Sequence, residues 1–119
     1  MNKDGWAMRL SVLGGGSFGM ALATHYAVAG HEVLWWMRQS DATSDLVRTR
    51  QHPSFLPGVT VPDSVQITTD LSLLSATDIA LVAVPAAAVQ DVLSQWVALG
   101  AVLPTVVIAA KGIDPDTLE

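Results

Sequence analysis

The sequence predicts an α/β fold in which helices cover a doubly wound parallel sheet. Short runs of strand-forming residues alternate with helix-forming segments along the whole chain. Two of these runs, residues 79–84 and 105–110, are almost wholly apolar, as is typical of parallel strands buried on both faces. The intervening segments are long enough to hold the crossover helices that parallel strands require.

The first two strands are predicted at residues 10–13 and 32–36. The first run is short and mostly apolar, and the second is rich in aromatic and branched residues that favour strands. Between them, residues 17–29 are rich in alanine and are followed by Gly30, which often comes directly after a helix. This order predicts a first strand–helix–strand unit.

A short polar helix is expected next, capped by Ser40 or Asp41 and ending near Arg50. Residues 52–62 contain three prolines and Gly58, so we expect a loop there.

The third predicted strand covers residues 65–68. Thr69 or Asp70 would then cap one helical turn that ends at Leu74.

The last elements are a strand at residues 79–84, a helix at 86–99 and a strand at 105–110. Pro85 ends the first of these strands. The helix is predicted to be amphipathic because its apolar residues fall at helical spacing. These apolar residues are Val89, Val92, Leu93, Trp96 and Val97.

Composition excludes several classes of protein. A chain of 119 residues with 50% hydrophobic and 14% charged residues forms one globular domain and is not disordered. Its net charge of −5 makes a nucleic-acid surface a poor candidate. The absence of cysteine excludes disulfides, zinc–thiolate sites and a cysteine nucleophile, and it suits the cytoplasm. No apolar run is long enough to span a membrane.

Metal-dependent and hydrolytic chemistry find no support either. No two of His25, His31 and His52 have metal-ligand spacing within one element, so we expect no metal site. The serine-hydrolase pattern G-x-S-x-G does not occur.

Residues 14–19 have the sequence Gly-Gly-Gly-Ser-Phe-Gly, which fits the pattern G-x-G-x-x-G. Here the pattern follows a predicted strand and opens a predicted helix, as it does where a Rossmann-like fold binds a dinucleotide. Gly14 would permit the tight turn, Gly16 would let a pyrophosphate approach the backbone, and Gly19 would let the helix pack closely. The helix N-terminus offers N–H groups to the phosphates, so even an acidic protein can bind this polyanion.

Arg38 indicates which dinucleotide is accepted. An NAD-selective site usually has Asp or Glu at the end of the second strand, about 20 residues after the first glycine. Here that strand ends in Trp35-Trp36-Met37-Arg38, and the next acid is Asp41. The Arg38 guanidinium can pair with a 2′-phosphate or stack on adenine, which favours NADP and leaves NAD open. The adjacent Trp35 and Trp36 should point to opposite faces of the strand, one into the core and the other toward the adenine side.

Pro85 and Lys111 follow the fourth and fifth predicted strands. Ligands of open parallel sheets bind beyond the carboxyl ends of the strands, which places Pro85 beside the nicotinamide half of a dinucleotide. Pro85 can equally serve only to start a helix. Lys111 could polarise a carbonyl oxygen or hold an anionic substrate, or it could be a solvated lysine in a turn.

Eight segments together resemble a known family: residues 12–19, 21–23, 30–33, 36–38, 55–58, 69–71, 82–85 and 110–113. The chain resembles the N-terminal domain of bacterial NAD(P)-dependent glycerol-3-phosphate dehydrogenases. The glycine loop is common to many families, whereas the Phe-Leu-Pro-Gly and Lys-Gly-Ile segments are more selective. By this resemblance, residues 9–119 form a dinucleotide-binding domain and residues 1–8 an N-terminal extension.

The resemblance implies reversible reduction of dihydroxyacetone phosphate to sn-glycerol 3-phosphate, a phospholipid precursor, with NADP or NAD. It places Ser17 and Phe18 against the cofactor, with Phe18 at a position that is often Trp. It places Arg38 at the adenosine end and Lys111 against both cofactor and substrate. Gly15 stands where the family often has Ala, a departure that we expect to be harmless. A homodimer of the full-length form stays open.

The family's second, helical domain carries its main catalytic lysine and its substrate-phosphate groups, and this chain ends at Glu119 before that domain. We therefore expect the chain to bind nucleotide without dehydrogenase activity, and turnover of dihydroxyacetone phosphate would contradict this. Two alternatives stay open: a stand-alone nucleotide-binding or regulatory module, and the N-terminal domain of another reductase such as ketopantoate reductase. A third alternative is a structural domain that binds no ligand. It would require that the glycine loop, Arg38 and Lys111 lie at one edge of the sheet by coincidence.

Overall fold

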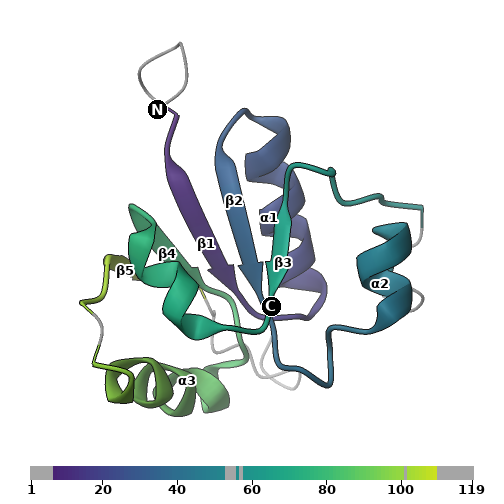
Figure 1. Cartoon of the computed structure of the whole chain (residues 1–119). Coiled ribbons are helices and arrows are strands. Elements are labelled where there is room, and N and C mark those ends of the chain that lie inside the picture. The colour runs from purple at the N-terminus through teal and green to yellow at the C-terminus, as the bar shows by residue number, and fades with distance from the viewer. Residues whose placement is uncertain (1–6, 53–55, 57, 101, 110–119) are drawn as a thin grey trace, which may run out of the picture.

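The computed structural model describes residues 7–52, 56, 58–100 and 102–109. In this part of the chain, five parallel strands form one sheet in the order β3-β2-β1-β4-β5 (Figure 1). The chain runs from β1 outward to β3 and then returns past β1 to β4 and β5, which confirms the predicted doubly wound fold. The strands are β1 (Arg9–Leu13), β2 (Glu32–Trp36), β3 (Gln66–Thr68), β4 (Ile79–Val82) and β5 (Thr105–Ile108).

Helices cover both faces of the sheet. The helix α1 (Ser17–Val28) packs on one face, while α3 (Ala86–Ala98) and the 3₁₀ helix η1 (Leu71–Ala76) pack on the other. Successive side chains of a strand point to opposite faces, so Trp35 joins the core under α1 and Trp36 joins the core under α3. The two tryptophans do point to opposite faces, but both of them are buried in a core, whereas only one was expected there.

The strand β1 marks the point where the winding direction reverses. It pairs with β2 on one side and with β4 on the other. In open α/β sheets, ligands bind beyond the carboxyl ends of the strands at this reversal. The glycine loop begins at this position, directly after Leu13.

Two of the strands differ from the prediction. We expected the fourth strand to reach residue 84, but β4 ends at Val82, which pairs with the last residue of β1, Leu13; the next residue, Gly14, turns toward β2. We expected the fifth strand to be buried, but β5 lies at the edge of the sheet that the described residues form, with β4 as its neighbour there. The side chains of Val107 and Ile108 are therefore 43% and 50% exposed.

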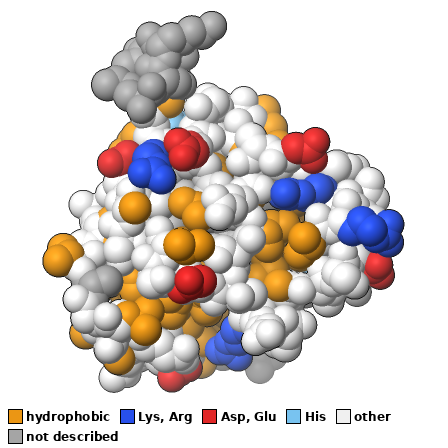
Figure 2. All heavy atoms as spheres, viewed as in Figure 1, with side chains coloured by type: hydrophobic (Ala, Val, Ile, Leu, Met, Phe, Trp, Pro, Cys, Tyr) orange, Lys and Arg blue, Asp and Glu red, His pale blue; other side chains and the backbone are white. Residues whose placement is uncertain are grey.

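The apolar face of α3 is also less buried than predicted. Val92 and Trp96 are buried, but Val97 is exposed. Figure 2 shows hydrophobic side chains at the surface on the side of the molecule where α3 and β5 lie. None of the helices in the described ranges is long and apolar enough to cross a membrane.

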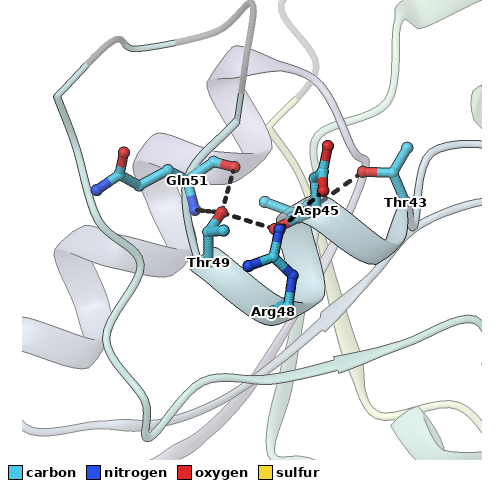
Figure 3. Close-up of polar contacts among 6 residues, drawn as sticks. Thr43, Asp45, Arg48, Thr49 and Gln51 are labelled. Carbon is cyan, nitrogen blue, oxygen red and sulfur yellow. Dashed lines mark hydrogen bonds and ion pairs between the residues drawn. The ribbon is translucent and has the colours of Figure 1, made fainter.

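The helix α2 (Ser44–Thr49) begins later than predicted, because Thr43 is its N-cap instead of Ser40 or Asp41. The Thr43 hydroxyl accepts a hydrogen bond from the Leu46 N–H at 3.2 Å (Figure 3). The helix is held further by an Asp45–Arg48 ion pair. Asp41 instead closes a turn after β2, in which its N–H donates to the Arg38 carbonyl at 2.9 Å. The Asp41 carboxylate is therefore not used as a helix cap.

The 3₁₀ helix η1 has Asp70 as its N-cap, one of the two predicted residues, and it extends two residues beyond Leu74. The hydroxyl and the N–H of Ser72 both donate to the Asp70 carboxylate, at 2.7 and 3.0 Å. These bonds favour the charged carboxylate and so lower the pKa of Asp70.

Candidate functional site

A hollow of about 410 Å³ lies at the carboxyl edge of the sheet. Its walls come from three segments that are distant in the sequence: the glycine loop after β1, the turn after β2, and the residues that join β4 to α3. Its lining residues are Gly14, Gly15, Gly16, Trp36, Arg38, Ser40, Asp41, Val84, Pro85 and Ala88. The volume falls within the range of small-molecule pockets, roughly 300–1,000 Å³.

The structure brings together four of the residues singled out from the sequence, namely Gly14, Gly16, Arg38 and Pro85, which all line this hollow. Three others belong to the first turn of α1 and are not among the lining residues: Ser17 and Phe18 are exposed, and Gly19 is buried. Lys111, the remaining candidate, lies outside the described residues.

The packing of the loop requires glycine at positions 14 and 19 but not at position 16. Gly14 has a φ of +139°, and a Cβ atom there would lie 2.9 Å from the Ala83 carbonyl carbon. A Cβ atom at Gly19 would overlap the Gly14 carbonyl oxygen, so α1 packs directly on the turn. A Cβ atom at Gly16 would meet no atom within 4 Å. The space beside Gly16 is therefore open for a ligand.

The N-terminus of α1 faces this open space through its N-cap, Gly16. No side chain caps the helix, and no acidic residue lies in its first turn. Such an end carries a partial positive charge and N–H donors, which suit an anion. In the described part of the chain, no three residues of the metal-ligating types come together to hold a metal ion.

Trp35 holds the glycine loop in place, a role that was not predicted from the sequence. Its buried indole Nε1–H donates to the Gly14 carbonyl oxygen at 2.6 Å. The Gly14 N–H in turn donates to the Trp36 carbonyl at 2.9 Å. Two consecutive residues of β2 thus form hydrogen bonds with the carbonyl and the N–H of Gly14. A buried indole N–H usually has an acceptor, but the sequence offers no means of choosing the Gly14 carbonyl.

We expect Trp35→Phe to destabilise the chain by about 1–3 kcal/mol, because it leaves the buried Gly14 carbonyl without its donor. The loss can be measured by urea unfolding. The matched control is Trp96→Phe, which removes an indole whose N–H bonds to Ser75 at 3.1 Å, far from the loop in the sequence. Amide hydrogen exchange at residues 14–16 should accelerate in Trp35→Phe and not in Trp96→Phe. Equal exchange in the two variants would show that Trp35 does not hold the loop.

Gly15 is tightly surrounded, so glycine in place of the family's Ala suits the local packing, in line with the expectation that this departure is harmless. A Cβ atom at Gly15 would lie 3.0 Å from the Asp41 Cβ and 3.1 Å from the Met37 Cβ. Met37 is fully buried and cannot move away easily. An alanine at this position would therefore press on the turn after β2.

The chain is also similar to known proteins. Residues 9–119 match the family described as NAD-dependent glycerol-3-phosphate dehydrogenase N-terminus. The chain is 36% identical to glycerol-3-phosphate dehydrogenase [NAD(P)+] 2 of Salinibacter ruber, over 92% of this chain and 32% of the relative. It is 35% identical to the glycerol-3-phosphate dehydrogenase [NAD(P)+] of a Thermoanaerobacter species, over 94% of this chain and 34% of the relative. The chain thus spans about a third of the length of the curated relatives that it matches.

Solved structures show the same likeness. The fold is similar to that of glycerol-3-phosphate dehydrogenase from Coxiella burnetii, with a TM-score of 0.73 and 25% identity over 84% of this chain and 31% of that one. A Plasmodium falciparum glycerol-3-phosphate dehydrogenase shares the fold, with a TM-score of 0.68 and 19% identity over 86% of this chain and 31% of that one.

Proposed function

The chain belongs to the family of NAD-dependent glycerol-3-phosphate dehydrogenases, whose N-terminal part it matches, and we propose that it binds NAD or NADP in the hollow at the carboxyl edge of the sheet. The observation that carries this proposal is the open backbone at Gly16, which lies at the uncapped N-terminus of α1. A pyrophosphate is the ligand that this arrangement suits best, because it needs both a close backbone approach and N–H donors.

The proposed roles of the surrounding residues follow from their places. The N-terminus of α1, with Gly16, Ser17 and Phe18, takes the pyrophosphate. Arg38 lies on the rim formed by the turn after β2 and takes the adenosine end. Pro85, after β4, takes the nicotinamide half. When bound, the cofactor would supply a hydride in its reduced form or accept one in its oxidised form, and these residues would hold and orient it.

We further propose that residues 9–119 are the nucleotide-binding domain of an oxidoreductase that interconverts sn-glycerol 3-phosphate and dihydroxyacetone phosphate. Lys111 would contact both the cofactor and the phosphorylated substrate. The proposal includes a cytoplasmic location and a homodimer of the full-length form. Neither a ketopantoate reductase nor a stand-alone regulatory module is favoured, since the relatives are named as glycerol-3-phosphate dehydrogenases.

The proposal is tested by titrating the chain with NADPH and with NADH while following tryptophan fluorescence, because Trp36 lines the hollow. We expect saturable binding, and we expect Arg38→Ala to weaken NADPH binding by about tenfold through loss of a charge-assisted contact. Arg48→Ala is the control, since Arg48 pairs with Asp45 on α2 and should leave binding unchanged. If the folded chain binds neither nucleotide, the proposed function is wrong.

A further inference from the structure

We propose that Asp41 is a specificity-determining residue that balances the two cofactors against each other. Its carboxylate would accept hydrogen bonds from the ribose hydroxyls of NAD(H) and oppose the 2′-phosphate of NADP(H). This inference rests on the proposed nucleotide site and adds a residue to it. The structural basis is the close approach of the Asp41 carboxylate to the glycine loop, beside Arg38.

The backbone fixes Asp41 at this place. The N–H groups of Asp41 and Ala42 both donate to the Arg38 carbonyl, at 2.9 and 3.2 Å, and the Thr43 N–H donates to the Asp41 carbonyl at 2.9 Å. Thr43 also caps α2, so the Asp41 side chain has no capping role. The turn thus places the Asp41 carboxylate at the carboxyl edge of the sheet, although β2 itself does not end in an acidic residue.

Gly15 allows the close approach. The ideal Cβ position of Gly15 lies 3.1 Å from the Asp41 Oδ2 and 3.0 Å from the Asp41 Cβ. Both residues line the hollow. Because a larger residue at 15 would displace the carboxylate, the glycine at 15 and the acid at 41 act together.

The Asp41 carboxylate is available to a ligand. It is exposed, and among the described residues it makes no hydrogen bond or ion pair, including none with Arg38. An exposed carboxylate with unused acceptor sites suits a pair of hydroxyl donors and repels a phosphate.

Arg38 and Asp41 therefore act in opposite directions on one rim. The guanidinium attracts a 2′-phosphate, whereas the carboxylate disfavours it. Selectivity is the difference between the two affinities, so the repulsive group matters as much as the attractive one. We expect the unaltered chain to bind both cofactors without strong preference.

The test compares NADPH and NADH dissociation constants, by fluorescence titration, for the unaltered chain and for Asp41→Asn. We expect Asp41→Asn to raise the preference for NADPH over NADH by about five- to tenfold, because a like charge near the 2′-phosphate is removed. Gly15→Ala should shift the preference in the same direction by displacing the carboxylate. The control is Asp63→Asn, which removes the same charge from an exposed position just before β3, at the opposite edge of the sheet.

The outcomes separate the two proposals. If the unaltered chain binds both nucleotides and Asp41→Asn leaves their ratio unchanged, the role of Asp41 is wrong and the nucleotide site stands. If Asp63→Asn shifts the ratio as much as Asp41→Asn, the effect comes from net charge and the role of Asp41 is again wrong. If the unaltered chain binds neither nucleotide, both proposals fail.

Discussion

Alanine at position 19 is expected to destabilise the chain by about 3 kcal/mol, the upper end of the usual cost of overpacking. Its Cβ would overlap the Gly14 carbonyl oxygen and lie 3.3 Å from the Trp35 Nε1. These two atoms are hydrogen-bonded to each other at 2.6 Å, and the Gly14 N–H is bonded to β2 as well. The loop therefore cannot move away from the new Cβ atom without breaking its hydrogen bonds to β2. Urea unfolding measures the loss.

The matched control for this substitution is Gly16→Ala. A Cβ at Gly16 meets no atom within 4 Å, and its φ of −83° suits any residue. We expect its cost to stay within about 1 kcal/mol, the penalty for alanine at an N-cap. Similar losses for the two variants would contradict the packing described for the loop.

Valine at position 16 is expected to weaken nucleotide binding by about a hundredfold, which corresponds to about 2.7 kcal/mol. The branched side chain would fill the open space beside the N-terminus of α1, where the proposed pyrophosphate binds. Calorimetric titration with NADPH measures the effect. The chain should remain folded, because a Cβ atom at this position would meet no protein atom within 4 Å.

The control for Gly16→Val is Ala21→Val, which adds the same side chain at an exposed position of α1 that does not line the hollow. Its NADPH affinity should equal that of the unaltered chain. Unimpaired binding by Gly16→Val would place the pyrophosphate elsewhere.

Local patterns in the sequence were sufficient to predict the sheet and its direction. The apolar run of β4 and the alternation of strands with helices predicted parallel pairing, and the G-x-G-x-x-G pattern predicted the turn between β1 and α1. The edge position of β5 was missed, because an apolar run does not reveal which strands lie at the centre of a sheet.

The parts of the site that escaped prediction depend on contacts between distant residues. The bond from Trp35 to Gly14 joins residues 21 apart. The place of Asp41 depends on which residue caps α2, and Ser40, Asp41 and Thr43 are all good caps. Only the turn at Arg38 decides between them and brings the carboxylate against Gly15.

The measurement that most directly tests the proposed site is a ¹H–¹⁵N correlation spectrum of the chain, recorded during titration with NADPH. We predict saturable shifts of the amides of residues 14–17, 38–41 and 86–88, which line the hollow or lie next to its lining residues in the sequence. The amides of Glu32 and Asp78, at the opposite edge of the sheet, should not move. An absence of shifts, or shifts confined to the exposed apolar side of α3 and β5, would contradict the assignment of the hollow as a nucleotide site.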